Sequence, residues 1–178
     1  MRWHRPSTRE LALAGFLVCM GLVSFALYLQ YFEHVEPCPL CMLQRVTFVA
    51  LGLAFLAAAI PRNNRLVIRF SALAGLALAI TGIGLATRHV WLQWNPPQFE
   101  ACTAGLLFQV LHAPLLRVLE RALRATGDCA TIDWTLLGLS IAQWAWIWFV
   151  LLAGLSGWIV FTPSGKRRGI ARRFNVAA

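Results

Sequence analysis

Charged side chains are scarce in this sequence. They make up 13% of its 178 residues, with only seven Asp and Glu, whereas hydrophobic side chains make up 59%. Soluble domains contain roughly 45–50% apolar residues. This balance excludes an ordinary soluble domain of this size and favours a membrane protein.

The sequence also lacks a basic face in which Lys and Arg alternate with aromatic side chains that could stack on bases. Its net charge of +9 comes mostly from basic residues that lie just outside apolar runs. There is no internal repeat and no low-complexity segment. We therefore expect no nucleic acid partner, and we interpret residues 1–178 as a single domain in contact with the lipid bilayer.

Four apolar runs are long enough to cross a bilayer. They cover residues 11–29, 42–60, 69–87 and 141–161. The first run has no charged residue and would form a helix of about 29 Å, at ~1.5 Å per residue. It is longer than the apolar part of a signal peptide, and no small-x-small cleavage site follows it. The sequence therefore predicts an all-α membrane protein, a four-transmembrane-helix bundle.

The positions of the basic residues predict how the bundle is oriented. Eleven of the 16 Lys and Arg lie in the N-terminal tail, the loop after the second run and the C-terminal tail. Such residues are retained in the cytoplasm. Six of the seven acidic residues lie on the opposite side. We predict a bacterial inner membrane protein with both termini cytoplasmic and loops 30–41 and 88–140 periplasmic.

The long loop 88–140 contains an amphipathic segment. Apolar side chains recur at helical spacing over residues 115–123, and arginines occupy the other side. Pro114 suits the start of a helix and Gly127 suits its end. We predict a short interfacial helix that lies flat on the bilayer surface.

Four of the five cysteines lie in the two predicted periplasmic loops. Cys38 and Cys41 form a Cys-x-x-Cys motif, and Cys102 and Cys129 lie in the longer loop. Two intervening residues let the sulfurs of the motif meet with little distortion, so the pair can cycle between dithiol and disulfide. A second pair gives the first a partner for exchange, in a compartment that is oxidising in bacteria. The pattern predicts disulfide chemistry.

Cys41 is predicted to lie in the first turn of the second spanning helix. The partial positive charge at a helix N-terminus favours thiolate over thiol. Arg45 lies one turn later on the same face and adds a permanent charge. Its side chain could instead extend to the nearby interface with no function. Because Arg45 follows Cys41 so closely, we favour a functional role.

The cysteines are also compatible with a metal site or a purely structural role. All four could bind zinc, although structural zinc sites usually have two closely spaced hooks, and Cys102 and Cys129 are far apart. These two could form a structural disulfide in a non-catalytic scaffold, with a stabilisation of roughly 3–4 kcal/mol. The small ring closed by Cys38 and Cys41 would add little stability, which favours a redox role. Covalent haem is excluded because Met42, not His, follows Cys41.

The sequence alone assigns no catalytic role to three further residues. Cys19 lies within the first span and is expected to be an inert packing thiol. His89 lies at the outer end of the third span, level with the Cys-x-x-Cys motif if the spans are parallel, and could equally be an interfacial residue without a role. Gln44 is expected to be a packing or interface residue.

Together these features resemble the disulfide bond formation protein B (DsbB) family. The resemblance is carried by four spans, a Glu-Pro-Cys-x-x-Cys motif that ends at Cys41, the following Arg45, a later Cys102, and a Gly-Asp-Cys motif that ends at Cys129. It covers nearly the whole chain. Pro-Leu at the centre of the Cys-x-x-Cys motif differs from some members, which could alter the potential of the pair but not the chemistry.

The resemblance implies a four-helix bundle that passes electrons from a periplasmic thioredoxin-like oxidase, DsbA, to membrane quinone, either ubiquinone or menaquinone. Cys38–Cys41 match the quinone-facing disulfide, and Cys102–Cys129 match the partner-facing disulfide. No metal is implied.

Three positions match the family's quinone pocket. Arg45 matches the arginine near the quinone, and His89 and Leu85 match pocket positions on the third helix. Reductases of the vitamin K epoxide type share the four helices and the Cys-x-x-Cys motif. Their paired loop cysteines precede the Cys-x-x-Cys span, whereas Cys102 and Cys129 follow it here.

The predicted orientation can be tested by thiol labelling. After reduction, a membrane-impermeant reagent applied to intact spheroplasts should label Cys38, Cys41, Cys102 and Cys129 and should spare Cys19. The reason is that the loops with few basic residues face outward. Labelling of the four loop cysteines only after lysis would show that the orientation is inverted.

Overall fold

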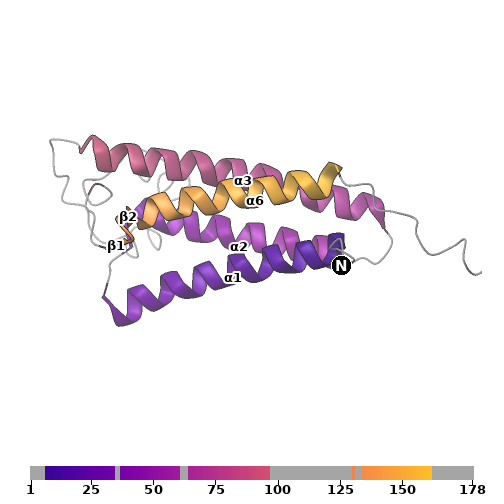
Figure 1. Cartoon of the computed structure of the whole chain (residues 1–178), viewed down its shortest axis with the longest axis horizontal. Coiled ribbons are helices and arrows are strands. Elements are labelled where there is room, and N and C mark those ends of the chain that lie inside the picture. The colour runs from indigo at the N-terminus through magenta and orange to yellow at the C-terminus, as the bar shows by residue number, and fades with distance from the viewer. Residues whose placement is uncertain (1–6, 35–36, 61–63, 97–129, 131–133, 162–178) are drawn as a thin grey trace, which may run out of the picture.

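The structure is a computed structural model, which describes residues 7–34, 37–60, 64–96, 130 and 134–161. Four long helices run side by side (Figure 1). They are α1 (Thr8–Phe32), α2 (Pro39–Ala59), α3 (Arg65–Trp94) and α6 (Ile141–Phe161). Each is long and apolar enough to cross a membrane. The predicted four-helix membrane bundle is therefore confirmed.

The helices extend beyond some of the predicted spans. The third helix begins at Arg65 and continues to Trp94, so residues 88–94, assigned to a loop from the sequence, are helical. Polar and aromatic residues can continue a helix past the apolar core of a bilayer because its backbone hydrogen bonds are made within the helix. The predicted interfacial helix at 115–123 lies outside the described residues, as do Cys102 and Cys129.

Local signals at the helix starts are clear. Ser7 caps α1 through a capping box, because its hydroxyl accepts a hydrogen bond from the backbone N–H of Glu10 and its own N–H donates to the Glu10 carboxylate. Cys38 caps α2, and Pro39 occupies the first helical position, where its fixed φ suits a helix and its missing N–H costs nothing.

A two-stranded hairpin, β1 (Thr135–Leu136) and β2 (Leu139–Ser140), precedes α6. Leu137 and Gly138 at its turn both have positive φ, 54° and 79°. Two central residues with positive φ match the twist of a tight hairpin. The sequence did not reveal this hairpin, because Leu-Gly is not a typical turn pair for such backbone angles and each strand has only two residues.

Small residues let α3 approach its neighbours closely. The buried positions of α3 recur every three or four residues, in the order Ala72, Gly75, Ala79, Gly82, Ala86 and His89. A Cβ placed on Gly82 would lie 2.3 Å from the Phe149 ring of α6. That ring stacks on Phe48 of α2, with centroids 4.0 Å apart. Small residues of this kind bring membrane helices together where lipid provides no hydrophobic driving force.

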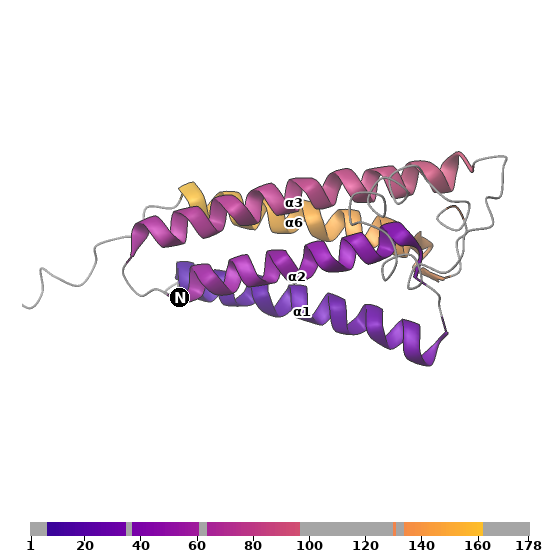
Figure 2. The ribbon, with the colours of Figure 1, turned by 180° about the vertical axis from the view of Figure 1, so that it is seen from behind.

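The first helix is held differently from the other three. It packs mainly on α2 and only lightly on α6. Figures 1 and 2 show that α1 diverges from the other helices toward the end that carries the hairpin. Many large apolar side chains on the outer surface are exposed, such as Leu17 and Phe70, as expected for a surface that faces lipid. The bundle is therefore packed closely around α3, and α1 is attached mainly through α2.

The close approach at Gly82 can be tested by adding one methyl group. Gly82→Ala should lower the thermal denaturation midpoint in detergent, with a loss of about 1–3 kcal/mol, because the new Cβ meets a ring already stacked on Phe48. Gly84→Ala is the control, since no atom lies within 4 Å of its added Cβ. Equal midpoints for the two variants would contradict the packing.

Candidate redox site and cavity

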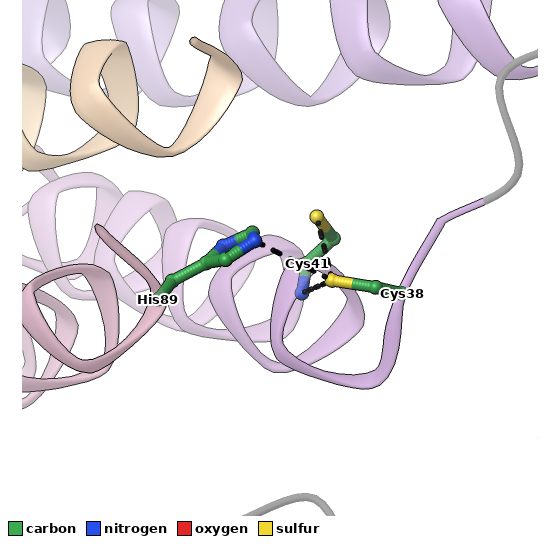
Figure 3. Close-up of side chains that lie close together, drawn as sticks. All are labelled: Cys38, Cys41 and His89. Carbon is green, nitrogen blue, oxygen red and sulfur yellow. Dashed lines mark hydrogen bonds between the residues drawn. The ribbon is translucent and has the colours of Figure 1, made fainter. Parts of the chain in front are cut away.

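The Cys-x-x-Cys motif lies at the start of α2. Cys38 is the N-cap, and its sulfur accepts a hydrogen bond from the backbone N–H of Cys41 at 3.3 Å. The Cys38 thiol donates to Cys41 Sγ, and the two sulfurs are 3.1 Å apart (Figure 3). The separation exceeds the ~2.05 Å of a disulfide, and small side-chain rotations would close it. The predicted position of Cys41 in the first turn of the helix is therefore confirmed.

His89 reaches this motif from α3. Its side chain is 3% exposed, and its Nε2 lies 3.7 Å from Cys38 Sγ, within the range of a hydrogen bond to sulfur. Figure 3 shows the ring directed at Cys38. The side chain is therefore an inward-facing neighbour of the cysteines, and its role at the site stays a prediction.

Gln44 forms a second contact of the histidine ring. Its Nε2 lies 3.4 Å from His89 Nδ1, and the side chain is 3% exposed. The sequence predicted only a packing or interface role for Gln44, so its place in a polar chain with His89 and Cys38 was missed. The spacing of small residues along α3 is a signal that could have shown His89 facing inward. No comparable signal in the sequence pairs Gln44 with His89.

Arg45 is directed toward α1. Its guanidinium donates to the Gln30 side-chain carbonyl and, at 3.1 Å, to the backbone carbonyl of Ala26. The side chain is half-buried, and its charge lies close enough to Cys41 and Cys38 to interact with both. An arginine in an apolar helix is costly unless it is paired. These two bonds hold Arg45 beside the cysteines, and its functional role stays a prediction.

A cavity of about 420 Å³ lies beside the motif, where α1 and α6 diverge. Its polar groups include Cys38, Cys41, Arg45 and His89. Most of the wall is apolar or aromatic, with contributions from α1, the hairpin and α6; these residues include Phe25, Trp134, Trp144 and Trp148. A mostly apolar pocket with a few convergent polar groups is typical of a small-molecule site.

The hairpin is fixed at the mouth of this cavity by specific contacts. Ser140 donates through its hydroxyl to the Gln93 side chain of α3 at 2.8 Å. The Trp144 indole N–H donates to the carbonyl of Leu136 at 3.1 Å. Phe25 of α1 meets Trp134 edge to face, with ring centroids 5.9 Å apart. These contacts connect α1, α3 and α6 around the cavity and give it a defined shape.

Two of the remaining predicted residues lie outside the cavity wall. Leu85 packs against the small apolar cluster that contains Cys38, Leu40 and Leu92, and it is not among the described residues that line the cavity. It contributes to the apolar packing around Cys38. Cys19 is fully buried, and its Cβ would lie 3.2 Å from a Cβ placed on Gly52. That position is the one expected for a packing thiol.

A donor set for a metal ion can also be defined among the described residues. Ligand atoms of Cys38, Cys41 and His89 all lie within 4.8 Å of one another. This set differs from the four cysteines considered from the sequence. A structural zinc site usually has four protein ligands, one more than this group supplies.

Comparison with known proteins agrees with these features. Residues 8–159 match the family model described as disulfide bond formation protein DsbB. The chain belongs to the DsbB family. This DsbB-family chain is 45% identical over 152 residues to the disulfide bond formation protein B of Methylococcus capsulatus, covering 85% of this chain and 93% of the relative.

Two further relatives with the same name support the assignment. The protein from Nitrosococcus oceani is 41% identical over 155 residues, which are 86% of this chain and 92% of the relative. The protein from Xanthomonas euvesicatoria is 39% identical over 171 residues, which are 94% of this chain and 97% of the relative. This DsbB-family chain is therefore a multi-pass membrane protein of disulfide bond formation, a redox function.

Proposed function

We propose that this DsbB-family protein is a quinone-dependent protein-disulfide oxidoreductase of the bacterial inner membrane. The observation that carries the proposal is the cavity between α1 and α6, whose apolar wall meets Cys38, Cys41, Arg45 and His89. The cavity lies at the end of the bundle where α1 diverges from the other helices (Figure 1), and in this proposal a lipid-soluble ring enters there.

The partner in this proposal is a periplasmic thioredoxin-like disulfide donor of the DsbA type. Its two thiols reduce the Cys102–Cys129 disulfide, and the partner leaves oxidised. The loop dithiol then reduces Cys38–Cys41 by attack of a thiolate on sulfur, which re-forms Cys102–Cys129. Each exchange moves two electrons and conserves the number of disulfides. The electrons thereby reach the Cys-x-x-Cys motif.

The acceptor is ubiquinone or menaquinone, which, when bound, takes up two electrons and two protons to become quinol. Cys38 and Cys41 together lose those two electrons and two protons as they return to the disulfide. A partner with a potential near −120 mV requires an acceptor that is more oxidising still. The mostly apolar wall of the cavity suits such a ring, and Arg45 and His89 supply the polar groups that would orient it.

The chain's own residues lower the energy of negative charge on sulfur. The N-terminus of α2 and the Arg45 guanidinium favour a thiolate on Cys41. The bonds from Arg45 to Ala26 and Gln30 hold that charge in place before the reaction, so little reorganisation is needed when negative charge develops.

The proposal is tested by mixing the purified protein with a reduced thioredoxin-like partner and ubiquinone or menaquinone. We expect loss of partner thiols that requires quinone and matches quinol formation one to one. Partner thiols that persist, with no quinone-dependent change, would instead indicate a scaffold with structural disulfides. Stoichiometric zinc in the purified protein, found by elemental analysis, would indicate a thiolate-ligated metal protein.

Serine variants separate the two cysteine pairs. Cys38→Ser or Cys41→Ser should abolish quinone reduction, since a two-electron exchange needs both thiols. Cys102→Ser or Cys129→Ser should block oxidation of the protein partner while a small dithiol still supports some quinone reduction. The relay is wrong if partner oxidation with quinone continues in all four variants.

Variants of Arg45 can separate the effect of its positive charge from the effect of its size. Arg45→Met should slow alkylation of Cys41 at neutral pH and weaken quinone reduction, with an effect on the order of 1–3 kcal/mol in kcat/KM. Arg45→Lys should recover part of the loss, because the charge returns without the planar group of donors.

Arg88→Met is the matched control for this experiment. It removes an equal charge from the neighbouring α3, where Arg88 is exposed and does not line the described part of the cavity. Its kinetics should equal those of the wild type. Equal kinetics for Arg45→Met and Arg88→Met would remove Arg45 from the site.

A further inference from the structure

We infer that Gln44 is a positioning residue that holds His89 in the tautomer whose Nε2–H faces Cys38. The inference starts from the contact between Gln44 Nε2 and His89 Nδ1 at 3.4 Å. An amide nitrogen is only a donor, so the ring nitrogen opposite must accept. A neutral imidazole with Nδ1 as acceptor has its proton on Nε2. That nitrogen lies 3.7 Å from Cys38 Sγ.

The surroundings favour a neutral ring over an imidazolium. The ionisable side chains among the described residues that line the cavity are Cys38 and Cys41 at the start of α2, Arg45 further along α2, and His89 itself from α3. The described lining residues of α1, the hairpin and α6 add no carboxylate. While both thiols are protonated, the positive charge of Arg45 therefore disfavours a second positive charge on His89.

Burial increases the importance of the contact with Gln44 for the orientation of the ring. Both side chains are 3% exposed, so water does not replace a lost partner easily, and a buried donor or acceptor without a partner costs about 1–3 kcal/mol. Without the amide, the ring could turn or exchange its proton between nitrogens. With the amide in place, the Nε2–H stays directed at Cys38.

The consequence is an additional stabiliser for Cys38. The charge of Arg45 interacts with both sulfurs, whereas the Nε2–H of His89 faces Cys38 and favours negative charge there. Cys38 needs this help when it is the attacking or leaving sulfur in thiol–disulfide exchange. This role in turnover rests on the proposed function, whereas the tautomer itself does not.

The tautomer can be read directly in the whole protein. The ¹⁵N chemical shifts of the His89 ring in the reduced protein in detergent micelles, assigned by comparison with His89→Phe, distinguish Nε2–H from Nδ1–H. We expect Nε2–H in the wild type and a mixture of tautomers in Gln44→Met. A wild-type ring protonated on Nδ1 would overturn the inference without the need for any variant of Gln44.

Cys38 reactivity tests whether Gln44 acts through the ring. In the reduced protein at neutral pH, Gln44→Met should slow alkylation of Cys38, located by tandem mass spectrometry, by roughly 3- to 10-fold, the effect of one hydrogen bond. In a His89→Phe background the same substitution should have no further effect. Equal slowing in both backgrounds would overturn the inference, because Gln44 would then act without the ring.

Thr47→Val is the matched control. Thr47 is buried one turn beyond Gln44 on the same helix, and its hydroxyl donates to the carbonyl of Leu43 at 2.8 Å, away from His89. We expect wild-type alkylation and ¹⁵N shifts in this variant. Neither measurement involves quinone or a partner protein. If the wild type does not oxidise the partner, the proposed function fails while the Gln44–His89 contact can still be confirmed.

Discussion

The close approach of α3 to α2 and α6 is the constraint on which the rest of this structure depends. Gly82 accepts the Phe149 ring at a distance where no Cβ fits, and that ring stacks on Phe48. The three helices are held together by this contact and by the row of small residues on α3. Because His89 lies on the same buried face of α3 as these small residues, the packing that joins the helices also brings a histidine to the Cys-x-x-Cys motif.

The polar side chains of the site are tolerated because each has a partner. Gln44 contacts His89, His89 contacts Cys38, and Arg45 is bonded to Gln30 and Ala26 on α1. An unpaired polar group at this depth would cost several kcal/mol. Arg45 therefore also has a structural role. It connects α1 to α2 beside the cavity, which Arg45 also lines.

The arrangement relates family membership to chemistry. A dithiol at a helix N-terminus with a cation fixed nearby favours thiolate chemistry. In the proposed function, the aromatic wall beside them would hold the ring of the quinone. Gln93 and Trp134 bring the hairpin and α1 into that wall, so the shape of the cavity depends on contacts between segments far apart in the chain.

Much of this protein was predictable from its sequence alone. Long apolar runs determine four spanning helices, because each backbone polar group in a bilayer must be bonded within its own helix. The position predicted for Cys41, in the first turn of a helix, is confirmed, and the redox role of Cys38 and Cys41 stays a prediction. Cys102 and Cys129 also came from the sequence, and their roles remain predictions.

Only the tertiary structure decided which side chains meet. Periodicity within a helix does not specify that Gln44 of α2 meets His89 of α3 or that Arg45 bonds to α1. Nor does it specify that Leu85 packs with Cys38 outside the cavity wall. These pairings depend on how the helices are rotated against each other, which packing at Gly82 and its neighbours determines. The cavity could not be predicted from the sequence either. It depends on the distance between α1 and α6, and no single segment of the sequence determines that distance.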